Sequence, residues 1–300
     1  MGRGGIEVLV AGSGVMGRGI AASFARAGIA TAVLSRRPEA VEGLDPAVAV
    51  LGALPEAAPE LIVESIPEVE GLKLALYAKI ERRYGGRPVL GSNTSGLSPE
   101  ALAAPLGHPE RFLGIHYFQP ADVAPLVEVA RVAKTADAAL ATAVRLLEAS
   151  GRSAIVLNEP IAGLLINRLQ HAILHEAYYL IERGICTAAD VDQVAKLLLG
   201  PRMSVTGLIE QKDISGLDTH ALAQAAIVPE LFHGASPSRA VQDKYAGGRI
   251  GVKTGTGFYD WRGMDVAGYR AWAAGLLGRV LALLEAERRP APPLSADDGK

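Results

Sequence analysis

Residues 6–17 read Ile6-Glu7-Val8-Leu9-Val10-Ala11-Gly12-Ser13-Gly14-Val15-Met16-Gly17. The apolar run at the start is typical of a buried strand, and the pattern after Gly14 predicts the beginning of a helix. In such a turn Gly12 permits the tight bend, Gly14 lets the backbone approach a pyrophosphate, and Gly17 allows the helix to pack on the strand. The helix N-terminus attracts the phosphate charge. Gly12–Gly17 therefore predicts a dinucleotide site, with a ligand-free glycine turn as the alternative.

The end of the second predicted strand bears on which dinucleotide binds. An acid that holds the adenosine ribose is expected about 20 residues past the glycines, but this chain has Ser35-Arg36-Arg37 there. A carboxylate would repel a 2′-phosphate, whereas a hydroxyl followed by guanidinium groups would bind it through charge-assisted hydrogen bonds. We therefore favour NADP as the cofactor. NAD is the alternative, with Arg36 and Arg37 as solvated surface charges.

The predicted secondary structure changes near residue 160, from alternating strands and helices to helices. Apolar runs alternate with helical patterns before it, which predicts a parallel sheet covered by helices, with strands at 6–11, 31–34, 61–64, 89–92, 112–116, 127–129 and 153–157. After it, helices are expected at 161–183, 187–199, 217–231 and 267–287. The predicted fold class is an α/β Rossmann-type doubly wound domain, residues 1–157, followed by an all-α dimerisation domain, residues 158–288. Residues 289–300 contain three prolines and predict a disordered tail.

Composition excludes several classes of function. The 300 residues are 49% hydrophobic and 21% charged, with a formal net charge of −2, so no broad basic surface for nucleic acid is expected. The single cysteine, Cys186, excludes an internal disulfide framework and suits a reducing compartment. The N-terminus carries no signal-peptide pattern, and no apolar window has the length of a membrane span. A cytoplasmic protein without a membrane partner is expected.

A second informative stretch is residues 114–120, which contain His116, with Glu128 following 12 positions later. A strand-loop-strand turn between them would bring the two side chains together. Oxidation of a hydroxyl group needs a base for its proton, and histidine titrates near working pH. A carboxylate beside the imidazole fixes its tautomer. A lone histidine at a strand end is more often structural, and Glu128 is what favours a catalytic role.

Together these stretches resemble the 3-hydroxyacyl-CoA dehydrogenase family over nearly the whole chain. The matching blocks, in the family's order, are residues 12–17, 63–68 with Lys73, 92–95, 114–120 with Glu128, 166–168 and 251–259. The resemblance implies a nucleotide-binding domain followed by a helical domain through which two copies form a homodimer. It also implies hydride transfer between a nicotinamide cofactor and the 3-position of a 3-hydroxy or 3-oxo acyl compound.

The resemblance assigns four catalytic residues. His116 is implied to be the base that takes the hydroxyl proton, and Glu128 to hydrogen-bond its imidazole. Ser95 matches a serine that hydrogen-bonds the substrate oxygen, and Asn167 matches an asparagine that helps hold substrate and nicotinamide. The alternatives are an ordinary turn serine for Ser95 and a helix-packing amide for Asn167.

Three more polar residues, Glu68, Lys73 and Asn93, fall in blocks that the family places beside the cofactor and substrate. For Lys73 the alternative is a solvated helix residue. No metal site is expected, because His171 and His175 have the spacing of two ligands on one helix but lack a third.

The chain departs from the family in ways that concern the substrate. The family usually carries a helical pair after the second strand that contributes to binding coenzyme A, and residues 36–60 are too short and too rich in proline for it. Gln119 stands where the family most often has Asn, Gly96 replaces a second serine, and residues 202–207 depart from the usual Pro-Met-Gly-Pro block. The substrate is thus a CoA thioester or a free acid, a carrier-bound acyl group or a ring-containing hydroxy compound.

Two other functions compete with this interpretation. A β-hydroxyacid dehydrogenase of the lysine-using type would need a catalytic lysine near the start of the long helix, where Asn167-Arg168 offers none. A non-catalytic dinucleotide-binding protein would not need the pair of His116 and Glu128. A small-molecule substrate and a homodimer remain the expected partners, because the helices after residue 161 are apolar on more than one face.

Overall fold

The computed structural model describes residues 5–290, 292, 293 and 295. Residues 291, 294 and 296–300 of the predicted tail lie outside the described part. The chain divides into two compact units, Met1–Leu169 and Gln170–Lys300. In the described part of the chain, no helix combines the length and the apolar character needed to cross a membrane.

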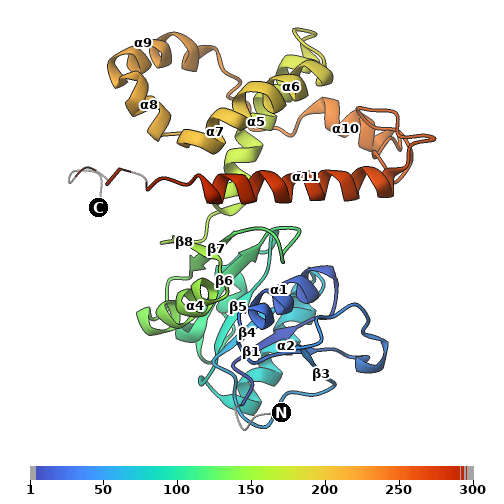
Figure 1. The fold of residues 1–300 in the computed structure, drawn as a ribbon, viewed down its shortest axis with the longest axis vertical. Helices are drawn as coiled ribbons and strands as arrows, with labels where there is room; N and C mark the ends of the chain where they lie inside the picture. The colour runs from blue at the N-terminus through green and yellow to red at the C-terminus, as the bar shows by residue number, and fades with distance from the viewer. Residues whose placement is uncertain (1–4, 291, 294, 296–300) are drawn as a thin grey trace. The chain divides into compact units, whose positions relative to one another are not determined.

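The first unit is built on an eight-stranded sheet in the order β3-β2-β1-β4-β5-β6-β7-β8 (Figure 1). The strands are β1 Val8–Ala11, β2 Thr31–Leu34, β3 Ala49–Leu51, β4 Leu61–Glu64, β5 Val89–Ser92, β6 Phe112–Tyr117, β7 Leu126–Arg131 and β8 Ser153–Leu157. Neighbours are parallel except β6 and β7, which are antiparallel. The order reverses between β1 and β4, the point at which doubly wound sheets bind ligands beyond the carboxyl ends of their strands.

Both faces of this sheet are covered by helices, as the sequence predicted. Strand β1 shows why: Val8 and Val10 belong to one apolar cluster and Leu9 to another, because successive side chains point to opposite faces. Residues of α1 Val15–Arg26 and α4 Asp137–Ala149 complete the first cluster, and residues of α2 Glu70–Tyr84 and α3 Pro99–Ala103 the second. Two hydrophobic layers thus hold the sheet rigid beneath its carboxyl edge.

Two features of the sheet differ from the sequence-based expectation. Strand β3 was not expected, because it is three residues long, lies at the edge of the sheet and sits in a segment rich in proline. Strands β7 and β8 run against the other six, although a parallel sheet was expected. The reversal follows from the short connection between β6 and β7, which joins neighbouring strands without a crossover helix.

The second unit is helical in its described part. Helix α5, Leu164–Glu182, begins in the first unit and continues into the second. The following helices are α6 Ala188–Val194, α7 Gly200–Thr206, α8 Glu210–Ser215, α9 Leu217–Ile227, α10 Arg239–Ala246 and α11 Val266–Ala286, with a π-helical turn at Ala195–Leu199 (Figure 1). Where a single helix was expected over 217–231, Pro229 lies in a separate 3₁₀ turn, Val228–Glu230, after α9.

Candidate active site

The glycine turn between β1 and α1 has the shape that a pyrophosphate requires. A side chain at Gly12 would overlap the backbone of Ser65, and one at Gly17 would overlap the carbonyl group of Gly12, so both positions need glycine for close packing. Gly14 has open space where a Cβ would lie, immediately before the free N–H groups of α1. These three positions fit the phosphates of a dinucleotide.

A pocket of about 1630 Å³ opens at the carboxyl edge of the sheet. Small-molecule pockets usually measure about 300–1,000 Å³, so this one has room for a dinucleotide together with a substrate. Of the predicted site residues, its lining includes Gly12, Ser13, Gly14, Val15, Met16, Ser35, Arg36, Arg37, Glu68, Asn93, Ser95, His116 and Asn167. Gly17, Lys73 and Glu128 lie behind the wall, where each is buried.

His116 and Glu128 meet because of strand register. They lie directly opposite each other in the antiparallel pair of β6 and β7, so their side chains share one face of the sheet. His116 Nδ1 lies 2.9 Å from Glu128 Oε2, and both side chains are buried. Glu128 Oε1 accepts hydrogen bonds of 2.8 Å each from the backbone N–H groups of Leu165 and Ile166 at the start of α5. Both carboxylate oxygens are therefore used, and Glu128 holds the imidazole and the helix together.

The other ring nitrogen of His116 faces the pocket. Its Nε2 lies 2.9 Å from Ser95 Oγ. The ring of Phe118 packs edge-on against the imidazole, with centroids 4.5 Å apart. Asn167, near the start of α5, also lines the pocket, and its amide makes no hydrogen bond with any residue in the described part of the chain. With Nδ1 held by Glu128, Nε2 is left to exchange a proton at the pocket wall.

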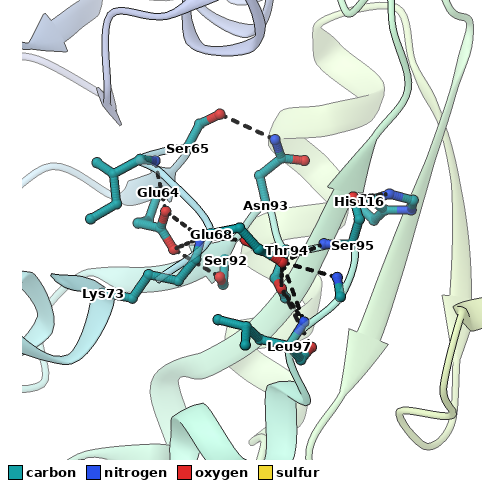
Figure 2. A network of polar contacts seen from close by, with 12 residues as sticks. Glu64, Ser65, Glu68, Lys73, Ser92, Asn93, Thr94, Ser95, Leu97 and His116 are labelled. Carbon is teal, nitrogen blue, oxygen red and sulfur yellow. Dashed lines mark hydrogen bonds and ion pairs between the residues drawn. The ribbon is translucent and has the colours of Figure 1, made fainter. Parts of the chain in front are cut away.

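Figure 2 shows the polar groups beneath this wall. Asn93 bridges two strand ends: its Nδ2 donates to Ser65 Oγ (3.1 Å) and its Oδ1 accepts from the Tyr117 N–H (2.9 Å). Lys73 is fully buried below the pocket and contacts the carboxylates of Glu64 and Glu68. Lys73 is thus placed as a buried ion-pair residue, neither the solvated helix residue of the alternative interpretation nor part of the pocket lining.

Glu68 connects to the loop that carries Ser95. Burial alone would raise the pKa of Glu68, but hydrogen bonds from the Thr94 hydroxyl and the Gly96 N–H, together with the charge of Lys73, lower it from 4.5 to about 2. A folded-state pKa below the unfolded value stabilises the protein above the unfolded pKa, and this contribution is lost as the pH falls toward the folded pKa.

The resulting prediction concerns acid stability. Glu68→Gln is expected to be less stable than the parent protein above pH 4.5, and the difference in free energy of unfolding should shrink as the pH is lowered from 4.5 toward 2. Urea unfolding followed by circular dichroism from pH 7 downward measures the difference. A gap that stays constant through this range would show that the Glu68 carboxylate does not titrate with a depressed pKa.

Sequence reasoning missed several residues of the site. Arg18, Lys79 and Arg83 line the pocket beside Arg36 and Arg37. A signal for Lys79 and Arg83 was available, because Leu72, Leu76, Lys79 and Arg83 share one face of α2 at helical spacing. Thr94 and the buried Glu64 were also missed, and no spacing rule would have found them, because their partners come from other elements.

His171 and His175, the two histidines with the spacing of metal ligands, have different surroundings. His171 is exposed, and His175 donates from Nε2 to the carbonyl oxygen of Gly234 (2.6 Å). Among the residues described, no three or more His, Cys, Asp or Glu side chains cluster as metal ligands would.

Comparison with known proteins agrees with this fold. Residues 7–49 and 52–160 match the NAD binding domain of 3-hydroxyacyl-CoA dehydrogenase, and residues 163–261 match the C-terminal domain of the same family. A probable 3-hydroxyacyl-CoA dehydrogenase of Caenorhabditis elegans is 35% identical over 207 residues, which cover 68% of this chain and 67% of the relative. The 5-formyl-3-hydroxy-2-methylpyridine 4-carboxylate 5-dehydrogenase of Mesorhizobium japonicum is 28% identical over 303 residues, 93% of this chain and 98% of the relative.

Solved structures of dehydrogenases have a similar fold. A crystal structure of 5-formyl-3-hydroxy-2-methylpyridine 4-carboxylic acid 5-dehydrogenase, an NAD⁺ dependent dismutase, aligns with a TM-score of 0.86 at 25% identity and covers 94% of this chain and 99% of its own. A 3-hydroxyacyl-CoA dehydrogenase of Archaeoglobus fulgidus aligns with a TM-score of 0.68 at 30% identity, covering 92% and 99%.

The doubly wound sheet, the dinucleotide turn and the histidine at the pocket wall define a nicotinamide-dependent oxidoreductase. The chain belongs to the 3-hydroxyacyl-CoA dehydrogenase family. Its activity is hydride transfer at the 3-hydroxyl of acyl compounds, with a nicotinamide cofactor.

Proposed function

We propose that the hydrogen-bonded chain Ser95–His116–Glu128 carries the proton transfer of this reaction. The supporting observation is that Ser95 Oγ and His116 Nε2 lie 2.9 Å apart on the pocket wall, while Nδ1 is held by the buried Glu128. A single substrate oxygen placed between the two pocket-facing atoms would be within reach of both. Asn167, whose amide has no other partner among the described residues, would hold substrate and nicotinamide.

In oxidation, the C–H electron pair leaves the substrate as hydride and the hydroxyl proton leaves to His116 Nε2. A bound nicotinamide would supply the hydride acceptor. Ser95 orients the substrate oxygen, and the carboxylate of Glu128 stabilises the positive charge that the imidazole gains. In reduction, the same imidazolium returns its proton to the carbonyl oxygen as hydride arrives at C3.

We also propose NADP(H) as the preferred cofactor. The pocket is lined by more basic than acidic side chains, with Arg18, Arg36, Arg37, Lys79 and Arg83 against Glu42 and Glu68. Arg36 and Arg37 are exposed to the pocket directly after β2, where an acidic residue would favour NAD. Ser35 Oγ accepts a hydrogen bond from the Arg37 N–H (3.2 Å), which fixes the backbone there.

Replacing both arginines by alanine tests this preference. The double variant Arg36→Ala, Arg37→Ala is expected to bind NADPH at least about tenfold more weakly, because hydrogen bonds to charged groups contribute about 1.5–3 kcal/mol. Its affinity for NADH should change little. Fluorescence titration with both nucleotides measures the two dissociation constants, with Arg82→Ala, on α2 but outside the pocket lining, as the control. Equal losses for both nucleotides, or a parent protein that prefers NADH, would contradict the proposal.

A second candidate concerns the substrate: a free hydroxy or oxo acid in place of a CoA thioester. The supporting observation lies between β2 and β4, where the described chain forms only a 3₁₀ turn, Pro38–Ala40, and the short strand β3, without an α-helix. The helical pair expected to help bind coenzyme A therefore has no counterpart there. The long alignment with a dehydrogenase of a pyridine carboxylate favours the same substrate class.

Initial rates of NADPH and NADH oxidation test whether the substrate is a CoA thioester or a free acid. The substrates are acetoacetyl-CoA, free 3-oxo acids and 5-formyl-3-hydroxy-2-methylpyridine 4-carboxylate at equal concentration. Turnover of the free acids alone, or of the pyridine compound, is expected if the substrate carries no coenzyme A. Strong turnover of acetoacetyl-CoA alone would overturn that candidate and leave an acyl-CoA dehydrogenase.

We propose further that residues 158–288 form a dimerisation domain occupied by a second copy of the chain. Ala177 is the single buried residue among the described residues of the second unit. Large apolar side chains are exposed instead, including Leu222 at 76%, Trp272 at 56% and Leu283 at 62%. Such surfaces are rare on monomers. Light scattering after size exclusion should give twice the 31.3 kDa of one chain, and a mass of one chain would contradict the dimer. We propose a cytoplasmic location as well, supported by the single cysteine of the chain.

A further inference from the structure

The ammonium group of Lys73 is buried beneath the pocket, with no exposed side-chain surface. Its Nζ lies 2.7 Å from Glu64 Oε1, 2.9 Å from Glu64 Oε2 and 3.2 Å from Glu68 Oε2. The ammonium group donates hydrogen bonds to both oxygens of Glu64 and lies within ion-pair distance of Glu68. Because a buried charge is costly without such partners, Lys73 is held by the two carboxylates, and its full burial keeps it away from the pocket lining.

Glu64 is the fixed end of this arrangement. It ends strand β4, and its side chain is fully buried. Besides Lys73, its carboxylate accepts from Tyr77 Oη (2.6 Å), Ser92 Oγ (2.8 Å) and the Ile66 N–H (2.8 Å). These donors come from α2, β5 and the loop after β4, so the carboxylate is held by three separate parts of the fold.

Glu68 is the movable end, with 41% of its side chain exposed. Its two oxygens have different partners. Oε2 faces Lys73, whereas Oε1 accepts from the backbone N–H groups of Ser95 (3.0 Å), Gly96 (2.9 Å) and Leu97 (3.3 Å) and from the Thr94 hydroxyl. Oε1 therefore accepts hydrogen bonds from all four residues of the 94–97 loop. Oε2 contacts Lys73, which connects the loop to the buried Glu64 (Figure 2).

We infer that Lys73 is a positioning residue: through Glu68 it sets the 94–97 loop so that Ser95 Oγ meets Nε2 of His116. The inference rests on the proposed roles of Ser95 and His116. Without the ammonium group, the carboxylates of Glu64 and Glu68 would repel each other. Glu64 has no exposed surface to move to, but Glu68 does, so Glu68 would turn outward and release the loop. A displacement of about 1 Å at a reacting group costs up to about 100-fold in rate.

Two variants and one matched control test this inference. Lys73→Met removes the charge at similar length, and Thr94→Val removes one donor to Glu68 while keeping the shape. Thr94→Ser keeps the hydroxyl and should restore most of the rate lost in Thr94→Val. For Lys73→Met we expect kcat to fall about 10- to 100-fold, with little change in the dissociation constants of NADH and NADPH. A large rise in these constants with kcat intact would instead make Lys73 a determinant of cofactor binding and overturn the inference.

The Ser95→Ala background separates positioning from other roles. If Lys73 and Thr94 act through the Ser95 hydroxyl, their replacement should lower kcat little further once that hydroxyl is absent. Losses that multiply with that of Ser95→Ala would show that they act by another route. Thr94→Val keeps the test decisive if Lys73→Met does not fold.

A spectroscopic measurement distinguishes failure of the inference from failure of the proposed function. The ¹⁵N NMR signal of the His116 imidazole, assigned by its loss in His116→Gln, reports the contact with Ser95 without any substrate. We expect Lys73→Met and Thr94→Val to move this signal in the same direction as Ser95→Ala does. An unchanged signal would overturn the inference even in an active enzyme. A moved signal in a protein that turns over none of the substrates would support the positioning and reject the proposed function.

Discussion

His116→Ala is expected to lower kcat by about 10²–10⁴-fold, the usual contribution of a general acid or base. Without the imidazole, the substrate hydroxyl loses the acceptor placed for its proton, because His116 Nε2 is the one hydrogen-bond partner of Ser95 Oγ among the described residues. Cofactor affinity should hardly change, since the glycine turn and the arginines after β2 are separate from this wall. Single-turnover rates after mixing enzyme and cofactor with substrate measure the chemical step directly.

Two controls accompany this variant. His108→Ala removes an exposed histidine paired with Glu110 outside the pocket lining, and it should keep the parent rate. Added imidazole should restore part of the rate of His116→Ala, because the vacated space opens on the pocket. A His116→Ala protein that turns over within a few-fold of the parent would remove His116 from the mechanism.

Glu128→Gln is expected to lower kcat by about 10²–10⁴-fold with little loss of stability. The amide oxygen can still accept the N–H groups of Leu165 and Ile166, so the start of α5 keeps its partners. The amide nitrogen, however, is a donor facing Nδ1, and it favours the tautomer with the proton on Nε2, where the lone pair is needed. The same change in the acid of a serine-protease triad costs about 10⁴-fold in kcat by this mechanism.

Glu128→Leu provides the contrast. It removes both acceptors, leaves two N–H groups of α5 without partners, and should destabilise the fold by about 1–3 kcal/mol for each group left unsatisfied in a buried place. Thermal unfolding and kcat measured together separate the two effects. A Glu128→Gln protein with nearly the parent rate would mean that the tautomer of His116 is set elsewhere.

The sequence could predict the elements that form the pocket because the relevant signals are local. Strands β2, β4 and β5 were predicted to the residue, since each is a short apolar run bounded by turn-forming residues. The glycine turn has a spacing that depends on neighbouring residues alone, and a side chain at Gly12 or Gly17 would overlap the backbone. The pairing of His116 with Glu128 follows from one short reversal between adjacent strands.

The polar network below the pocket could not be predicted from local sequence signals. Lys73 looks like a solvated helix residue in the sequence, and only the fold reveals that its end lies against Glu64 on a strand and Glu68 in a loop. Strand β3 was missed because it is three residues long and lies at the edge of the sheet in a proline-rich segment. The sheet as a whole was expected to be parallel, whereas β7 and β8, which are parallel to each other, run against the other six strands because a short connection joins β6 to β7 without a crossover helix.

Hydride transfer from nicotinamide C4 to C3 of the substrate is measured most directly with a deuterium label. NADPH or NADH carrying deuterium at nicotinamide C4, prepared separately as each diastereomer, is mixed with the protein and either acetoacetyl-CoA or a free 3-oxo acid. The product is analysed by mass spectrometry and NMR. The account predicts that one diastereomer delivers its deuterium to C3 in step with cofactor oxidation, and that His116→Ala suppresses the transfer. Cofactor oxidation that leaves C3 without deuterium for both diastereomers would contradict it.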